Sequence, residues 1–240
     1  MIYEPKGRAL EYAPLACNLA VGCVHGCRYC YGPGAFRVPR ADWTVPLPKN
    51  DLVKRFARSA ERFAGDPREI LFSFATDPFG TFEQVRDLRE ILPIAETHRL
   101  RLTILTKNPM AAEEFLPIMH RNGWRLGVSL CWHTEAAMGE WEPGAPSIAS
   151  RLVGLDLARR AGVQTWVSVE PVIDPREALL TIEAVRDIVD EIKVGAWNHD
   201  RRAKEINWRS FLALARSALR DRPHMFKRDL LELAGEEAPR

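Results

Sequence analysis

The stretch Gly22-Cys-Val-His-Gly-Cys-Arg-Tyr-Cys-Tyr31 places three cysteines, Cys23, Cys27 and Cys30, within eight residues, directly after the first apolar run of the chain. Three thiolates on one tight loop are soft ligands for a metal centre. An iron–sulfur cube held by cysteine normally takes four thiolates, so one iron would keep an open position for another ligand. The spacing therefore supplies an incomplete set of thiolate ligands, and a cluster held in this way would take part in chemistry.

A zinc site is the alternative interpretation of this loop, because zinc also takes cysteines two to four residues apart, with Cys17 or His25 as the fourth ligand. Structural zinc sites usually have a second knuckle elsewhere in the chain, and Cys131 stands alone. A disulfide framework is disfavoured by the odd count of five cysteines and by the lack of a secretory leader. We therefore expect a protein of the reducing cytoplasm.

Composition sets the outer bounds of the fold. The chain has 240 residues, of which 46% are hydrophobic, and contains no apolar stretch of the roughly 18 residues that a membrane span needs. This length predicts a single domain over 1–240 with a core at about 15–220. Because no apolar stretch is long enough, we expect no membrane partner. The net charge of +2 neither demands nor excludes a nucleic-acid partner.

Short apolar runs alternate along the chain with stretches of helical period, and the runs predict six strands at 15–21, 70–75, 100–105, 126–130, 165–169 and 188–194. The predicted helices cover 51–64, 83–97, 111–122, 146–161, 175–185 and 207–219. Such alternation predicts an α/β fold with mainly parallel strands. Six units are fewer than a full barrel needs, which favours a partial (β/α)6 TIM-type barrel. A doubly wound sheet is the alternative, although no glycine-rich phosphate loop follows the first strand.

Polar or metal-binding residues follow every predicted strand. The carboxyl ends of barrel strands form the active-site face, so we expect these residues to meet at one mouth. The six ends are Cys23 to Cys30, Thr76-Asp77-Pro78, Thr106-Lys107-Asn108, Ser129 to His133, Glu170-Pro171 and Trp197-Asn198-His199.

The cysteine spacing, with Tyr29 directly before the third cysteine, resembles that of the radical S-adenosylmethionine (SAM) superfamily. The resemblance implies that Cys23, Cys27 and Cys30 hold a [4Fe–4S] cluster whose open iron binds SAM. It also implies an electron donor such as flavodoxin or ferredoxin. In the family, the reduced cluster splits SAM, and the resulting 5′-deoxyadenosyl radical abstracts a hydrogen atom from the substrate.

Further segments are similar to the spore photoproduct lyase branch of that superfamily: Ser73 to Pro78, Leu105-Thr-Lys107, and the loop Trp141 to Ser147 followed by Arg151. This likeness implies a lyase-like reaction, with nucleic acid as one substrate class. A radical SAM enzyme that acts on a peptide or a metabolite is an alternative. A further one is a binding module that an iron–sulfur or zinc site only stabilises.

The resemblance also implies roles for individual residues. Tyr29 would pack near the cluster or the adenine, and Tyr31 would line the substrate side as a catalytic candidate. The polar parts of SAM need a cation and several oxygen atoms. They would be met by Thr76 or Asp77, Lys107, Ser129 and Glu170. Three of these residues also have a structural interpretation: Lys107 as a solvated lysine, Ser129 as a small core residue, and Glu170 as a helix cap or a member of an ion pair.

One departure from the lyase pattern concerns the return of a hydrogen atom to the product. The lyase carries a cysteine just before the strand end that corresponds to Thr76-Asp77. In this chain Phe74 and Ala75 occupy that place. Cys131, at the end of the fourth predicted strand, is the catalytic candidate that would substitute for that thiol. A buried structural thiol is the alternative for Cys131, because free cysteine is among the most buried residue types.

Overall fold

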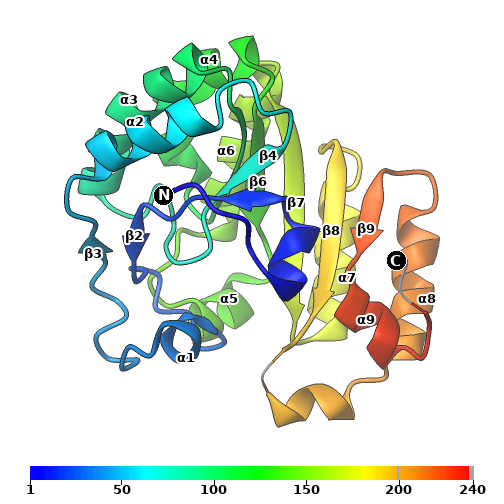
Figure 1. Ribbon diagram of the computed structural model, residues 1–240. Helices are drawn as coiled ribbons and strands as arrows, with labels where there is room; N and C mark the ends of the chain where they lie inside the picture. The colour runs from blue at the N-terminus through cyan, green and yellow to red at the C-terminus, as the bar shows by residue number, and fades with distance from the viewer. Residues whose placement is uncertain (199, 238–240) are drawn as a thin grey trace.

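The computed structural model describes residues 1–198 and 200–237. Its main sheet has seven strands in the order β1-β4-β5-β6-β7-β8-β9, and all neighbouring strands pair in parallel. The sheet curls into an incomplete barrel (Figure 1), which confirms the predicted α/β partial barrel. The strands are β1 (Leu15–Ala16), β4 (Glu69–Phe72), β5 (Arg101–Thr106), β6 (Arg125–Ser129), β7 (Gln164–Val172), β8 (Glu191–Ala196) and β9 (His224–Phe226).

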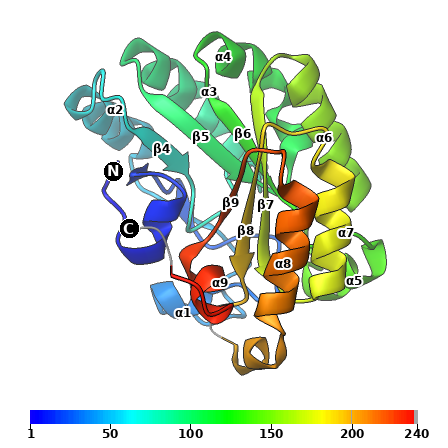
Figure 2. The same ribbon diagram turned by 90° about the vertical axis from the view of Figure 1, so that its right-hand side faces the viewer.

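Helices cover the outer face of this sheet (Figure 2). Four of the long ones begin at a side chain that accepts a hydrogen bond from the first helical turn, namely Thr81, Ser147, Asp174 and Asn207. The helices are α1 (Gly32–Phe36), α2 (Leu52–Arg62), α3 (Phe82–Thr97), α4 (Leu116–Arg121), α5 (Glu135–Trp141), α6 (Ile148–Arg160), α7 (Pro175–Val185), α8 (Trp208–Leu219) and α9 (Arg228–Leu233). Short 3₁₀ segments lie at η1 (Gly7–Glu11), η2 (Pro109–Phe115) and η3 (Arg201–Glu205).

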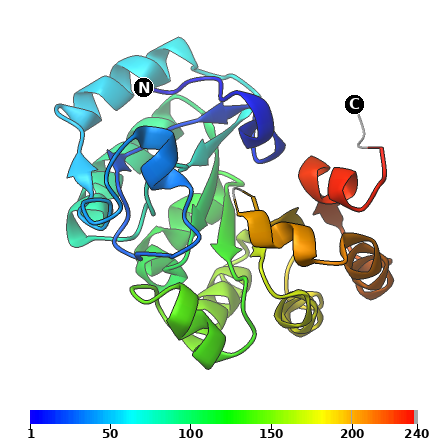
Figure 3. The ribbon, with the colours of Figure 1, turned by 90° about the horizontal axis from the view of Figure 1, so that it is seen from below.

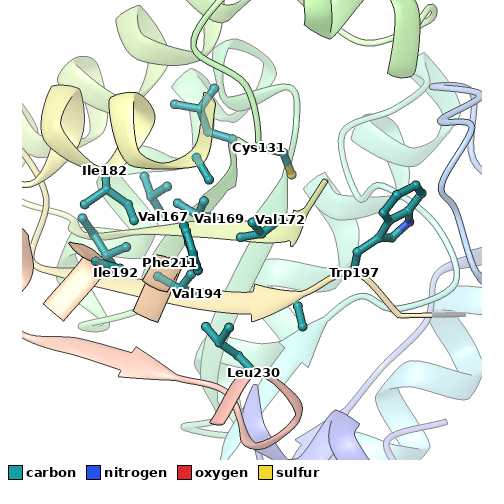
Figure 4. Close-up of a cluster of buried hydrophobic side chains, with 14 of the residues drawn as sticks. Cys131, Val167, Val169, Val172, Ile182, Ile192, Val194, Trp197, Phe211 and Leu230 are labelled. Carbon is teal, nitrogen blue, oxygen red and sulfur yellow. The ribbon is translucent and has the colours of Figure 1, made fainter. Parts of the chain in front are cut away.

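The core consists of apolar side chains of the strands packed against the covering helices. One large cluster joins β4 and β5 to α3, and a second joins β7 and β8 to α7 and α8. Figure 4 shows the second cluster, in which Val167, Val169 and Val194 pack with Ile182 and Phe211. Burying one such side chain stabilises a fold by about 1.5–3 kcal/mol, so these clusters hold the strand ends in fixed positions.

The first predicted strand, 15–21, is wrong as a single element. The chain leaves the main sheet after β1, and β2 (Ala20–Val21) pairs in antiparallel fashion with β3 (Leu47–Pro48). Asn18 lies between the two pieces, and its side-chain oxygen accepts hydrogen bonds from the amides of Phe74 and Ala75. This contact ties the turn before the cysteines to the end of β4.

Other boundaries also differ from the predictions. β7 extends to Val172, so Glu170 lies inside the strand. The predicted helix at 111–122 begins as η2, because Pro117 has no N–H group with which to continue an α-helical ladder. The periodicity of the sequence predicted neither α1 and α5 nor the strands β3 and β9.

The carboxyl ends of the strands lie at the lower end of Figure 1, which Figure 3 views from below. The α1 segment, α5 and η3 surround this end. The carboxyl ends are therefore approached between segments that are far apart in the sequence. No helix in the described part of the chain is long and apolar enough to cross a membrane.

Candidate active site

A cavity of about 490 Å³ lies at the carboxyl ends of the strands. Its walls come from the cysteine loop, the ends of β4 to β8, and segments near both chain ends. The structure thus brings together all but one of the site residues predicted from the sequence. Those that line the cavity are Cys23, Cys27, Cys30, Tyr29, Tyr31, Thr76, Asp77, Lys107, Ser129 and Glu170.

Backbone hydrogen bonds fix the cysteine loop. The amide of Cys23 donates to the carbonyl of Trp43 (2.8 Å), and the amide of Cys30 donates to the carbonyl of Cys27 (3.1 Å). The guanidinium of Arg40 donates to the carbonyls of Cys27 (3.1 Å) and Cys30 (2.9 Å). Arg40 therefore clamps two of the three thiol-bearing residues in one orientation.

The link between α5 and α6 supports the loop from a second side. Arg28 donates its amide to the carbonyl of Trp141 (2.8 Å), and Gly144 donates its amide to the carbonyl of His25 (3.0 Å). A Cβ atom at Gly144 would lie only 2.6 Å from the carbonyl oxygen of Val24. Close approach of the two backbones thus requires glycine at this position.

Asp77 joins the cysteine loop to the strand ends. One carboxylate oxygen accepts hydrogen bonds from the hydroxyl of Thr106 (2.6 Å) and the amide of Phe79 (2.9 Å). The other lies 2.8 Å from His25 Nε2 and accepts from the amide of Lys107 (2.7 Å). Burial alone would raise the pKa of Asp77, but His25 and these donors lower it to about 2. Both oxygens are engaged within the protein, so this position favours a structural role over SAM binding.

Glu142 is the centre of a buried charge network that the sequence analysis missed. Its carboxylate accepts hydrogen bonds from Arg151 and from the hydroxyl of Tyr29, and lies 3.9 Å from the Lys107 ammonium. Burial would raise the pKa of Glu142, but Lys107 and Arg151 lower it. The sequence signal was present in the loop from Trp141 to Ser147 that carries the family resemblance, because Glu142 is its one acidic residue.

Lys107 presents a buried cation on the cavity wall. Its ammonium lies 5.6 Å from the centre of the Tyr29 ring, and its side chain is 14% exposed. Burial alone would lower the pKa of Lys107, but Cys27 and Glu142 raise it, so the group stays protonated at neutral pH. The solvated lysine considered for this position is therefore wrong.

Two hydroxyl groups complete this side of the cavity. Thr76 Oγ1 accepts a hydrogen bond from the side chain of Gln84 (2.6 Å), which leaves its own proton free to donate. Ser129 is 9% exposed, and its carbonyl accepts a hydrogen bond from Arg151 (3.0 Å). Both hydroxyl-bearing residues line the cavity.

Glu170 lies in a second buried cluster, which the sequence analysis also missed. Its carboxylate accepts hydrogen bonds from the hydroxyl of Tyr12 and from the ammonium of Lys227. The Lys227 ammonium also lies 3.1 Å from the centre of the Tyr12 ring. Tyr12 and Lys227 come from opposite ends of the chain, so no local sequence pattern could have linked them.

Tyr31 and Cys131, the two predicted catalytic residues, lie in different surroundings. Tyr31 lines the cavity, and its hydroxyl donates to the carbonyl of Phe74 (3.2 Å). Cys131 is 2% exposed and lies in the hydrophobic cluster of Figure 4, where its thiol donates to the carbonyl of Glu170 (2.8 Å). Cys131 is not among the cavity-lining residues, so its position gives the catalytic prediction no support.

The tryptophans near the mouth are part of the packed interior. Trp132 and Trp197 are 2% and 6% exposed, and Trp141 stacks on Trp132 with ring centres 5.9 Å apart. They close the core at the end of the barrel, although Trp197 also lines the cavity. His199, which the sequence analysis placed beside them, lies outside the described residues.

The donor set agrees with the predicted cofactors. No three His, Cys, Asp or Glu side chains in 1–198 and 200–237 converge to hold one metal ion. A zinc site needs its ligands about 2.0–2.3 Å from a single ion. A [4Fe–4S] cluster binds its thiolates to different irons, so its ligands do not converge on a single ion. Three thiols beside the buried cation of Lys107 fit a cluster and a carboxylate-bearing cofactor.

Comparison with known proteins gives the family. The family model described as the radical SAM superfamily matches residues 17–192. Spore photoproduct lyase complexed with dinucleoside spore photoproduct has a TM-score of 0.64 at 17% identity, covering 91% of this chain and 64% of the lyase. Streptococcus suis SuiB bound to S-adenosylmethionine has a TM-score of 0.62 at 13% identity, covering 88% of this chain and 49% of SuiB. Curated protein sequences give no match.

A parallel partial barrel with its cavity at the carboxyl ends of the strands is the architecture of a barrel enzyme. The chain belongs to the radical SAM superfamily, whose model covers most of its length. Its fold is similar to that of spore photoproduct lyase, as the sequence resemblance predicted. Membership of this superfamily implies a [4Fe–4S] cluster and SAM. The chain spans just under two thirds of the length of the lyase.

Proposed function

We propose that Cys23, Cys27 and Cys30 hold a [4Fe–4S] cluster and that SAM binds in the adjoining cavity. The observation that carries this proposal is that all three thiols line a single cavity together with the buried ammonium of Lys107. When bound, the reduced cluster and SAM supply a 5′-deoxyadenosyl radical that abstracts a substrate hydrogen atom. The site thus serves reductive cleavage of SAM within a single domain of 240 residues.

The residues of the chain orient SAM and exclude water. The Lys107 ammonium binds the carboxylate of SAM, since a buried cation forms strong hydrogen bonds to a carboxylate. The hydroxyls of Thr76 and Ser129 meet its remaining polar groups. Asp77 and Glu142 act through other groups: Asp77 holds the cysteine loop, and Glu142 holds Lys107 and Tyr29 in place.

We propose a nucleobase as the substrate group. The wall of the cavity includes the apolar side chains of Phe74, Leu105 and Trp197, which suit a flat, weakly polar group. The structural likeness to a lyase complexed with a dinucleoside photoproduct supports the same class. Phe74 and Ala75 leave no thiol at the position where the lyase has one, so the product radical would need a different hydrogen donor, for which Tyr31 is the candidate on the cavity wall.

Anaerobic reconstitution with iron and sulfide tests the cluster and SAM cleavage. We expect a protein with about four irons per chain that forms 5′-deoxyadenosine from SAM when dithionite reduces it. Cys30→Ala should lose most of the iron and all of the product. The matched control is Cys17→Ala, because Cys17 is buried at the end of β1 and does not line the cavity. Unchanged iron content in Cys30→Ala would refute the proposal.

Binding to DNA tests the substrate class separately. We expect tighter binding to ultraviolet-irradiated DNA than to undamaged DNA, with an affinity that falls as salt rises. Equal affinity for the two DNAs would leave the radical SAM assignment intact and would direct the substrate search to peptides or metabolites.

A further inference from the structure

A second hollow, of about 330 Å³, flanks the cysteine loop and is not used by the function proposed above. Its lining comes from β2, β3 and the segment that follows α1. Most of its residues are apolar: Val21, Gly22, Val38, Ala41, Trp43, Val45 and Leu47, with Asp42 as the one charged member.

Trp43 connects this hollow to the active site. It lines both the hollow and the active-site cavity, and its side chain is buried against Gly32 and Phe36. Its carbonyl accepts the amide hydrogen bond of Cys23 (2.8 Å). The hollow is thus linked through Trp43 to the backbone of a thiol-bearing residue.

Exposed apolar side chains surround the hollow. Val45 is 64% exposed, Leu47 is 60% exposed and Phe36, which packs on Trp43, is 37% exposed. Side chains of this kind gathered around one hollow are typical of a protein interaction site.

The same part of the chain carries a strong positive charge. Residues 22–62 contain eight Lys and Arg against three Asp and Glu, a net charge of +5, whereas the rest of the chain has a net charge of −3. Figure 1 shows α1, β2, β3 and the start of α2 along one side of the molecule. The exposed cations of residues 22–62 are Arg28, Arg37, Arg40, Lys54, Arg55, Arg58 and Arg62.

We propose that this hollow, together with the exposed cations of residues 22–62, binds an acidic one-electron carrier protein. The inference rests on the function proposed above, because the carrier passes one electron to the cluster that Cys23 helps to hold. The carrier is oxidised by one electron and the cluster is reduced by one, and no bond or proton is transferred. A small apolar centre with a charged rim matches the transient contacts that electron carriers make.

Charge and chemistry favour a protein over a nucleic acid on this surface. A phosphate backbone would pair with the cations, but it offers no apolar group for Val45, Leu47 and the hollow between them. An acidic protein with an apolar patch around its cofactor edge matches both features. Opposite charges would also speed the encounter of the two proteins, most strongly at low salt.

Calorimetric titration with oxidised flavodoxin, an acidic carrier, measures the docking directly and requires no turnover. For the reconstituted protein we expect binding at 50 mM salt that weakens at least tenfold at 300 mM salt. The double variant Arg37→Glu/Lys54→Glu and the single variant Val45→Asp should each raise the dissociation constant at least tenfold at low salt. None of these residues lines the active-site cavity.

The matched controls lie on α8 and beside it, on the other side of the molecule. Arg220→Glu exchanges a cation that is 75% exposed, and Leu214→Asp exchanges an apolar side chain that is 54% exposed. Both should bind flavodoxin as the unmodified protein does. If the control variants weakened flavodoxin binding as much as the test variants do, the proposal would be overturned.

A comparison of reductants separates this inference from the proposed function. With dithionite, the test variants should form 5′-deoxyadenosine at the unmodified rate, whereas with reduced flavodoxin their rate should fall at least tenfold. If the unmodified protein fails even with dithionite, the proposed function fails, and the calorimetry still decides the docking. Lack of flavodoxin binding at 50 mM salt, or loss of DNA binding instead in the same variants, would overturn the docking proposal.

Discussion

His25 and Asp77 join the cysteine loop to the end of β4: His25 Nε2 lies 2.8 Å from Asp77 Oδ2, and both side chains are buried. Between β2 and α1, the cysteine loop has no helix or strand of its own. Its orientation relative to the sheet therefore depends on contacts such as this one. The geometry of the thiols is thus set partly by a carboxylate that belongs to a different strand end.

Replacing Asp77 with Asn should loosen this connection. An amide puts an NH₂ group where one carboxylate oxygen now accepts two hydrogen bonds, and it removes a buried charge that faces His25. We expect a loss of about 2–4 kcal/mol in the free energy of unfolding, measured by urea denaturation, with reduced iron uptake on reconstitution. Asp221→Asn, at a carboxylate that is 88% exposed, should change stability by less than about 0.5 kcal/mol.

The stabilisation from Asp77 should disappear in acid. Its pKa in the folded protein is about 2, whereas an aspartate in an unfolded chain has a pKa of about 3.9. Because the folded pKa is the lower one, the carboxylate contributes fully above about pH 4 and loses its contribution as the pH falls toward 2. Between pH 5.5 and 2.5 the free energy of unfolding of the unmodified protein should fall by about 1–2 kcal/mol more than that of Asp77→Asn. Parallel losses in the two proteins would contradict this account.

The fold was predictable where apolar runs were regular. The parallel strands β4 to β8 and the helices α2, α3 and α7 follow the periodicity of their residues closely. β9 was missed because its three residues are too few to show a pattern. The break between β1 and β2 was missed because Asn18 forms its contacts with residues 74 and 75, which are distant in sequence.

The candidate site was predictable to the extent that local motifs mark it. The cysteines and Lys107 stand in such motifs, and the structure places them on one cavity. The buried partners Glu142, Tyr12 and Lys227 became visible only through the fold, since each pairs with a residue of a different element. Local motifs in the sequence identified the side chains that face the cavity. They did not identify the buried partners that hold those side chains in place.

The pair of Arg151 and Glu142 gives a further test. Both side chains are fully buried, and Arg151 also donates to the carbonyls of Ser129 and Pro146. Arg151→Met would leave part of the charge on Glu142 uncompensated, so we expect a loss of about 3–5 kcal/mol in the free energy of unfolding. In the double variant Glu142→Leu/Arg151→Met the loss should be clearly smaller than the sum of the two single losses, as a urea-denaturation cycle would show. Additive losses would mean that the pair does not interact.

Lys107→Met should weaken the binding of SAM. Removing the ammonium beside Glu142 takes away the cation proposed to bind the SAM carboxylate. Truncating one partner of a desolvated charge pair costs about 2 kcal/mol or more, which is roughly thirtyfold in affinity. Anaerobic calorimetry on the reconstituted protein measures this dissociation constant. Lys54→Met removes a lysine that is 82% exposed and should leave the constant unchanged. Unchanged SAM affinity in Lys107→Met would exclude Lys107 as the carboxylate-binding group.

Gly144→Ala and Gly139→Ala form a matched pair that tests the support of the cysteine loop by the link between α5 and α6. At Gly144 a Cβ atom would lie 2.6 Å from the carbonyl oxygen of Val24, so one backbone segment must move. At Gly139, within α5, no atom lies within 4 Å of the added Cβ atom. We expect Gly144→Ala to lose about 1–3 kcal/mol of stability and a large part of its iron, and Gly139→Ala to gain about 0.5–1 kcal/mol through its better helix propensity. Urea denaturation and iron analysis measure both effects, and full iron content in Gly144→Ala would show that the cysteine loop does not depend on this contact.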